Sequence, residues 1–341
     1  MLKTWKTAAA AVALALVTAA ATPAARAAEA LKLEIGYIPI LAAAPLFVLE
    51  GEGWAKKEGF ELKLTRFESG PAGIQALAAG KIDMLYAGVA PVIVAKSKGV
   101  DVAVVANSGM EEMTVVSRGP LADASDGVPA ADAFKAFFAK NGRKAKIGTQ
   151  PPGSVPNTTL QHWLTKMAKV DPALVEIVPM GIEKTQQALM AGALDAATIR
   201  EPTVTIVRQA DPKSAIMALG GDMFPQQPGT VVAAHGTVIK NHPDALTRLI
   251  ALHVKAVDTV TSNPKRTAEL ANEYLGKGLV EPAVLESAIA SPASKFDADP
   301  HTILEPARKM QAYQEELGTA EPGIAVDQAF DFRFYDAAVK K

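Results

Sequence analysis

Apolar and polar residues alternate in short stretches from residue 31 onward, and helical patterns separate these stretches. Strands are expected over 31–35, 60–64 and 82–86, and helices over 46–58, 69–80 and 91–98. Ser69 or Gly70 can cap the second of these helices, Pro71 suits its first turn, and Gly80 ends it. The alternation of strands and helices predicts a parallel α/β unit.

The pattern recurs 112 positions later in the chain. Residues 75–83 align with 187–195 with six identities in nine, and the same offset places Ile35-Gly36 on Ile147-Gly148. We therefore expect two lobes built on the same βαβαβ plan. Ligands of such sheets bind outside the carboxyl ends of the strands. The loops of interest follow Gly36, Phe67, Tyr86, Gly148, Val178 and Ile199.

The chain beyond Lys240 has a different, helical pattern. Each expected helix starts at a proline preceded by a polar residue, at His242-Pro243, Asn263-Pro264, Glu281-Pro282 and Asp299-Pro300. We expect this region to pack as a helical layer on the first lobe. Short extended runs at 113–116 and 231–234 suit two crossings between the lobes. The predicted domains are 28–115 with 229–341 for lobe 1, and 116–228 for lobe 2.

The first 27 residues have the pattern of an export signal. Lys3 and Lys6 precede 14 mostly apolar residues, which are too few to span a bilayer, and Ala25-Arg26-Ala27 fits a cleavage site. We expect a cleaved signal peptide and a periplasmic product. No later apolar stretch is long enough to cross a membrane.

Composition excludes several classes of function. The chain of 341 residues has no cysteine, and its net charge is −1, so neither a thiolate site nor nucleic-acid binding through bulk charge is expected. No nucleotide-binding, metalloprotease or serine-hydrolase motif occurs, and the five histidines lack metal-ligand spacing. The adjacent acids Glu111-Glu112 are typical of a solvated face. We expect no enzyme activity, no cofactor and no metal.

Several short motifs together resemble the nitrate/sulfonate/taurine-type solute-binding proteins of ABC importers. The motifs are 35–37, 68–72, 76–83, 86–91, 148–154, 192–197, Glu201-Pro202, 241–245 and Asn263-Pro264. The resemblance implies an α/β, bilobal, type II periplasmic-binding-protein fold, with two crossing strands and a helical C-terminal layer. It also implies capture of a small solute between the lobes and delivery to a membrane permease.

Two loops present polar groups at expected helix starts. Ser69-Gly70 offers free N–H groups and the positive end of a helix dipole, which favour an anion, although an ordinary N-cap has the same sequence. In the second lobe, Gln150, Ser154 and Asn157 belong to a proline-stiffened loop, in which Ser154 can likewise be a plain cap.

Arg200 and Glu201 follow the second lobe's third strand. Adjacent residues of an extended segment point in opposite directions, so one of the two is expected to face the cleft. Arg200 would favour a carboxylate, sulfonate or phosphate, and Glu201 an amine, ring N–H or cation. The resemblance suggests the acid before the proline. However, Thr203 stands where members often have an aromatic residue, and a surface salt bridge is a further alternative.

Other candidate contacts come from strand ends and crossings. Tyr37 and Tyr86 end first-lobe strands, where each can face a solute or belong to the core. Gly88 belongs to the motif that follows Tyr86. Ser108 and His235 are expected near the cleft floor, and a core histidine is an equal interpretation of His235.

The predicted function is a monomeric periplasmic receptor that closes over one small, anionic solute. A binding protein for a pyrimidine-like vitamin precursor is an alternative. A sensory module or an exported enzyme on the same scaffold is another. The first alternative would keep its binding in an Arg200→Ala variant.

Overall fold

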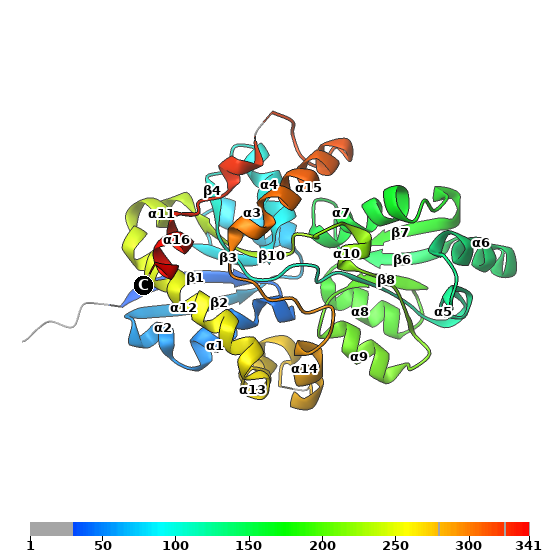
Figure 1. The fold of residues 1–341 in the computed structure, drawn as a ribbon, viewed down its shortest axis with the longest axis horizontal. Helices are drawn as coiled ribbons and strands as arrows, with labels where there is room; N and C mark the ends of the chain where they lie inside the picture. Colours follow the sequence, from blue (N-terminus) through cyan, green and yellow to red (C-terminus); the bar gives the residue numbers. More distant parts are fainter. Residues whose placement is uncertain (1–29, 279, 324, 341) are drawn as a thin grey trace, which may run out of the picture.

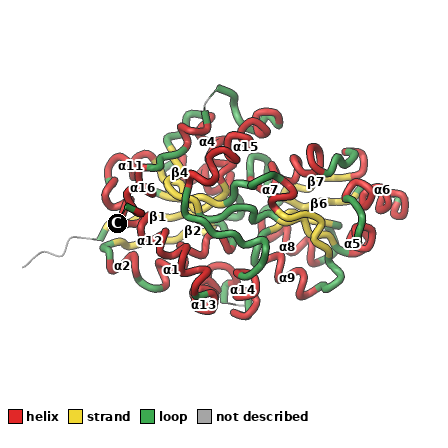
Figure 2. Tube along the Cα trace, viewed as in Figure 1, coloured by secondary structure: helices red, strands yellow, loops and turns green. Residues whose placement is uncertain are grey.

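The strands form two separate sheets in the computed structural model, which describes residues 30–278, 280–323 and 325–340. The predicted export signal lies outside these residues. The strands are β1 (Leu31–Tyr37), β2 (Phe60–Arg66), β3 (Met84–Gly88), β4 (Val102–Asn107), β5 (Thr114–Ser117), β6 (Ala145–Thr149), β7 (Val175–Pro179), β8 (Ala196–Ile199), β9 (Ala215–Leu219) and β10 (Thr230–His235). Figure 2 shows the two groups of strands with helices around each.

Both sheets have the same order of parallel and antiparallel strands. The first is β2-β1-β3-β10-β4 and the second is β7-β6-β8-β5-β9. In the first sheet β10 is antiparallel to its neighbours, and in the second sheet β5 is. Each lobe is therefore a sheet with its helices, and each receives one strand that arrives from the other lobe. This confirms the predicted bilobal α/β fold. The second sheet starts at Thr114, two residues before the expected boundary, and the division into domains stays a prediction.

The helices cover both faces of each sheet. They are α1 (Ala44–Gly51), α2 (Trp54–Lys57), α3 (Gly70–Ala78), α4 (Val89–Ser97), α5 (Gly119–Ser125), α6 (Ala130–Asn141), α7 (Val155–His162), α8 (Ile182–Met190), α9 (Thr203–Ala210), α10 (Gly220–Met223), α11 (Gly236–Asn241), α12 (Pro243–Ser262), α13 (Pro264–Gly276), α14 (Pro282–Ile289), α15 (Leu304–Glu316) and α16 (Arg333–Val339). Short 3₁₀ turns occur at Leu41–Ala43, Pro172–Leu174, Pro300–Ile303 and Val326–Ala329, and a π-helix at Trp163–Met167. No helix within the described ranges has the length and hydropathy needed to cross a membrane.

The repeated stretches have the same conformation in both lobes. Helix α8 lies 112 residues after α3 at both of its ends. In the first lobe the Asp83 carboxylate accepts a hydrogen bond from Glu34 N at 2.8 Å, and in the second the Asp195 carboxylate accepts one from Lys146 N at the same distance. Each aspartate fastens the turn after its helix to the first strand of its lobe's βαβαβ unit, β1 or β6.

A close approach between strand and turn is also repeated. A Cβ added to Gly36 would lie 2.6 Å from Ile82 Cδ1, and one added to Gly148 would collide with Leu194 Cδ1, its counterpart in the second lobe. Only glycine leaves room for these side chains. The repeat therefore reflects a shared packing arrangement rather than chance in an alanine-rich chain.

Two predicted helices differ from the structure. The helix expected over 46–58 is two helices, α1 and α2, because Gly53 between them has a φ of 67° in the left-handed region. The proline-stiffened loop of the second lobe also predicts a helix after it, over 157–169; in the structure this helix begins at Val155 and continues after His162 as a π-helix. Apolar periodicity alone does not distinguish a continuous α-helix from an interrupted helix or a π-helix, because each of them keeps its apolar residues on one side.

The C-terminal helices pack on the first lobe as expected, with α12 against α1 and α16 (Figure 1). They also reach the second lobe, since α14 contacts α9 and α15 contacts α7. Thr165 and Tyr313 hydrogen bond at 3.0 Å across this second contact. The layer therefore joins the two lobes as well as covering the first.

Candidate functional site between the lobes

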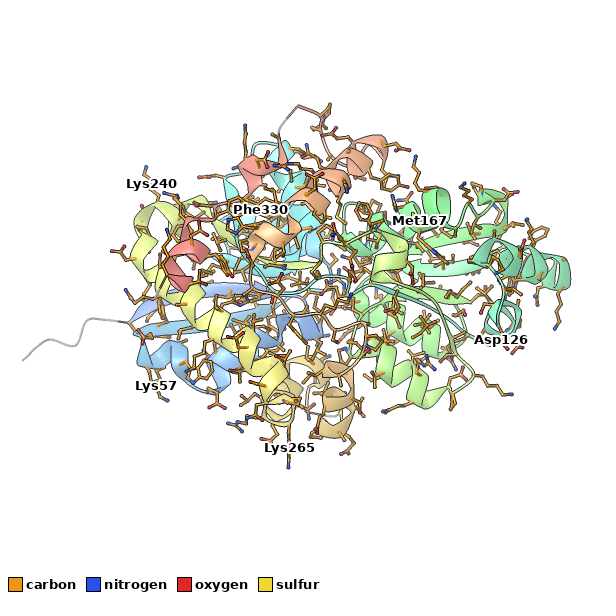
Figure 3. All side chains as sticks on the ribbon, in the orientation of Figure 1. Lys57, Asp126, Met167, Lys240, Lys265 and Phe330 are labelled. Atoms are coloured by element: carbon orange, nitrogen blue, oxygen red, sulfur yellow. The ribbon has the colours of Figure 1, made fainter. Side chains whose placement is uncertain are left out.

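Three chain segments lie side by side where the lobes meet. Residues 108–113 connect β4 to β5, and residues 224–229 lead back to β10; Glu111 N donates to Gln227 O at 2.8 Å between them. A third segment, which the sequence analysis did not anticipate, follows α14, and its Lys295 O accepts from Met110 N at 2.9 Å. Exposed charges such as Lys57 and Asp126 mark the outer ends of the two lobes, far from this junction (Figure 3).

Arg200 and Glu112 form a buried ion pair at the junction. Their Nε and Oε1 atoms are 3.5 Å apart, and the two residues are 5% and 4% exposed. Thr230, the first residue of β10, donates its hydroxyl to both carboxylate oxygens of Glu112 at 2.8 and 3.0 Å. The pair therefore links the second lobe, the first crossing and the first sheet.

Burial opposes ionisation of both partners. It raises the pKa of Glu112, although Arg200 and the Thr230 hydrogen bond act in the lowering direction. It lowers the pKa of Arg200, which Glu112 partly offsets. Glu112 was expected on a solvated face, and that prediction is wrong, because the crossing carries it into the junction while Glu111 pairs with Lys295.

The end of the Arg200 side chain is free to bind something else. Its Nε also contacts Met113 Sδ at 3.5 Å, but among the described residues neither Nη1 nor Nη2 donates a hydrogen bond. Gly88 lies opposite, where an added Cβ would be 3.7 Å from Nη2 and 2.6 Å from Val155 Cγ2. Glycine at position 88 therefore lets the guanidinium and α7 approach the first sheet.

Other unpartnered polar groups surround the same guanidinium. A cavity of about 10 Å³, the size of one water, is lined by Arg200, Gln150, Thr198 and Thr203. Within the described part of the chain, the buried Thr198 hydroxyl and the Gln150 side chain form no hydrogen bond. Arg200 can only donate, and Gln150 and Thr198 can donate as well as accept, so the three side chains together can serve the oxygens of an anion.

Of these two adjacent residues, Arg200 and not Glu201 has side-chain groups without a hydrogen-bond partner beside this cavity. Thr198 and Arg200 are two residues apart in an extended segment, so their side chains share one side. The Glu201 carboxylate instead accepts hydrogen bonds from Thr205 N and Oγ1, both at 3.0 Å, at the start of α9. Burial raises the pKa of Glu201, while bonds from Ser291 and Thr205 lower it. Glu201 also contributes to the wall of a second cavity of about 10 Å³, beside Glu112 and Lys295.

The two expected helix-start loops act as caps. The Ser69 hydroxyl accepts from Ala72 N, and the Ser154 hydroxyl from Asn157 N, both at 3.3 Å. Asn157 accepts a hydrogen bond from Gln161. Gly70 packs against Pro91, where a Cβ would be 2.8 Å from Cγ. These residues position α3 and α7 at the junction, and their contact with a solute stays a prediction.

Three other expected contacts lie away from Arg200 or are already bonded. Tyr86 is buried and its hydroxyl bonds to His253 Nδ1 at 3.1 Å, which makes it a core residue. Tyr37 packs edge-on against Phe47 and Tyr274. Ser108 donates to Ala42 O at 2.6 Å, close to the junction but within the first lobe.

His235 was expected near the cleft floor, and this placement is wrong. Strand β10 runs antiparallel to β3, so Thr230 lies beside Gly88 at the junction and His235 lies at the opposite edge of the sheet. There the imidazole caps α11 by bonding to Thr237. The expectation placed His235 at the crossing itself, whereas strand β10 lies within the first sheet and brings Thr230, not His235, to the junction.

A charged cluster closes the mouth of the junction. Glu183 of α8 pairs with Arg66 at 2.5 Å and with Lys277 at 2.9 Å, both from the first lobe. Lys277 and Arg66 lower the pKa of Glu183. Glu68 of the first lobe accepts from Glu183 N at 3.2 Å with its carboxylate and from Ile182 N at 3.1 Å with its carbonyl. Arg66, Glu183 and Lys277 line a cavity of about 180 Å³ together with residues of α9.

No group of three or more acidic or histidine side chains within residues 30–278, 280–323 and 325–340 could hold a metal ion. The residues of the candidate site that the sequence did not indicate are Glu112, Thr198 and Thr230. Their positions in the sequence offered the available signal: Thr198 precedes Arg200 by two residues, and Glu112 immediately precedes the expected crossing at 113–116.

Curated relatives cover most of the chain at low identity. A protein of Brachyspira hyodysenteriae, provisionally named an ABC transporter periplasmic binding protein, is 26% identical over 253 residues, 73% of this chain and 71% of its own length. A Bacillus subtilis protein, provisionally named an aliphatic sulfonates-binding protein, is 26% identical over 245 residues, 70% and 69% of the two chains. A provisionally named binding protein of Brucella suis is 26% identical over 73% of each chain.

Solved structures share the fold. The nitrate-binding protein NrtA from Synechocystis superposes with a TM-score of 0.77 at 14% identity, over 92% of this chain and 89% of that one. The alkanesulfonate-binding protein SsuA from Xanthomonas axonopodis, solved with MOPS bound, gives 0.71 at 17% identity over 90% and 100%. The NMT1-like family matches residues 26–275, which is more than half of the sequence. The chain therefore belongs to the NMT1-like family.

Proposed function

We propose that this protein is the periplasmic solute-binding component of an ABC importer. It captures a small anionic solute between its lobes and delivers it to a membrane permease. The names of the relatives support the transport role, and all three are named as binding proteins rather than enzymes. The bilobal architecture suits capture by closure, in which contacts from both lobes shift an equilibrium between open and closed states.

One observation carries the choice of an anion. The buried guanidinium of Arg200 has two terminal nitrogens without a hydrogen-bond acceptor in the described chain, beside the unpartnered donors of Gln150 and Thr198. A planar carboxylate, nitrate or sulfonate group accepts from such a fork in a bidentate manner. Each adjoining cavity has room for about one water, so a large ring would need far more rearrangement of the junction than a compact anionic group would.

The test is a binding screen with nitrate, methanesulfonate, butanesulfonate and acetate, followed by thermal unfolding. A solute at 100 times its dissociation constant stabilises the folded protein by ~2.7 kcal/mol. We expect Arg200→Gln combined with Glu112→Gln to abolish this stabilisation, because the double variant removes the fork without leaving Glu112 as an unpaired buried charge.

Arg208→Ala is the matched control, because Arg208 is an exposed arginine of the same lobe. It should keep the wild-type response. If the double variant bound an anion as well as the wild type did, Arg200 would not be the anion site. Small-angle scattering with the bound anion should show compaction, and size-exclusion chromatography should show the expected monomer.

A further inference from the structure

The positive charge of Arg200 is already compensated before any solute enters. Glu112 lies 3.5 Å from its Nε, and both side chains are almost fully buried. An anion that joined this pair would bring the local charge to −1 in a space with little water. Burying an uncompensated charge is costly, so the site needs a further positive charge when the anion binds.

The surrounding charged groups do not supply that charge. Around Glu112 the lining of the adjoining cavity contains Arg200, Glu201 and Lys295. Lys295 is half-exposed and pairs with Glu111, while Glu201 is held by Thr205 at the start of α9. Glu112 itself has one strong donor, the Thr230 hydroxyl, which serves both of its oxygens.

We infer that Glu112 takes up one proton from solvent when an anion binds to Arg200, so that the protein binds the anion and a proton together. The inference rests on the proposed function. The carboxylate becomes a carboxylic acid, the guanidinium transfers its pairing to the anion, and the net charge of the site stays at zero. Burial of Glu112 acts in the same direction, since it favours the uncharged acid.

The coupling has a measurable signature in the wild-type protein. Isothermal titration calorimetry with nitrate or methanesulfonate is suitable, because neither anion titrates between pH 6 and 9. Repeating the titration in buffers of different ionisation enthalpy counts the protons taken up. We expect about one proton per anion, and a dissociation constant that rises about tenfold per pH unit above the pKa of free-state Glu112.

A pair of neighbouring variants assigns the proton. Glu112→Gln mimics the protonated acid, so we expect no proton uptake and a dissociation constant that stays within about twofold from pH 6 to 9. Glu111→Gln removes the same formal charge one residue away, from a side chain that pairs with Lys295, and should keep the wild-type proton uptake. Circular dichroism checks that both variants fold.

The outcomes separate this inference from the proposed function. Anion binding that requires Arg200 but takes up no proton in the wild type would overturn the role of Glu112 alone. So would proton uptake that persists in Glu112→Gln. A wild-type protein that bound none of the anions would overturn the proposed function. The calorimetry on the wild type decides the question even if Glu112→Gln does not fold.

Discussion

The two lobes share a plan but differ at the positions that face each other. Helix α3 begins with Ser69, whose side chain caps it, whereas α8 begins with Gly181, 112 positions later, and has no cap from its own lobe. Glu68 of the first lobe supplies the missing acceptor. Likewise, β3 ends in Gly88 while β8 is followed by Arg200. One lobe supplies space and the other supplies charge, so the site requires both.

The largest expected difference between the lobes concerns the repeated aspartates. Asp195 accepts two hydrogen bonds from Arg143, at 2.6 and 2.8 Å, in addition to the one from Lys146 N. Among the described residues Asp83 has no such arginine. We expect Asp195→Ala to lower the free energy of unfolding by about 4 kcal/mol and Asp83→Ala by about 1–2 kcal/mol, because hydrogen bonds to charged groups contribute the most.

Tryptophan fluorescence can follow each lobe separately during urea unfolding. Trp54 lies beside the first sheet and Trp163 in the second lobe, so in a chain that begins at Ala28 and therefore lacks Trp5, the Trp163→Phe and Trp54→Phe backgrounds report one lobe each. Equal losses from the two aspartate variants would mean that Arg143, whose side chain is 49% exposed, contributes nothing measurable.

A smaller effect is expected from a histidine that only the first lobe has in its core. His253 is fully buried between Tyr86 and Asn107 O, and burial lowers its pKa to about 4. The folded protein therefore favours neutral His253, and its contribution is fully present above pH 6.5. As the pH falls from 6.5 to 4, the unfolded chain binds the proton first and about 3 kcal/mol of stability is lost.

Unfolding free energies at several pH values test this effect. The wild type should lose stability more steeply than His253→Gln between pH 6.5 and 4.5. His162→Gln is the control in the second lobe, because His162 is only half-buried, though burial also lowers its pKa. The raised pKa values of Glu112 and Glu201 have the opposite effect, because the stability that these two groups contribute is lost as the pH rises. The difference between the wild type and His253→Gln therefore isolates the effect of His253.

Local patterns predicted much of the fold and little of the pairing within the site. Pro243, Pro264 and Pro282 begin helices as expected, because proline at a helix start acts through its own backbone. The 112-residue repeat predicted the second lobe because each lobe carries its own copy of the strand, the helix and the aspartate that fastens the turn to the strand. The Arg200–Glu112 pair joins residues 88 positions apart, and whether such an acid is buried depends on the path of the crossing.

The direction of a strand was a further limit of the sequence. The run 231–234 was recognised as extended, but an extended pattern reads the same in both directions. The antiparallel orientation of β10 moves His235 to the far edge of the sheet and brings Thr230 to Glu112. An assignment of site residues from strand ends therefore needs the topology as well as the pattern.

The prediction with the smallest expected effect separates closure of the two lobes from folding of each lobe. Glu68→Ala removes the carboxylate that caps α8 across the junction, and Ser69→Ala removes the cap that α3 receives within its own lobe. A helix cap contributes about 1 kcal/mol. Ser69→Ala should therefore lower the free energy of unfolding by about this amount, since its cap is present whether the lobes are open or closed; a loss of solute affinity in addition would mean that Ser69 also contacts the solute.

Glu68→Ala should instead change solute binding and not the free energy of unfolding, because its contact with α8 exists only when the lobes meet. Its loss should weaken anion binding about fivefold and shift small-angle scattering toward the open form, with little change in unfolding of either lobe. If Glu68→Ala instead destabilised the first lobe and left the dissociation constant unchanged, the contact would be a consequence of closure that contributes nothing to it. Gly181→Ser would restore a cap from within the second lobe only if the two segments moved apart by a few tenths of an ångström, because a Cβ there would lie 3.3 Å from Glu68 Cβ.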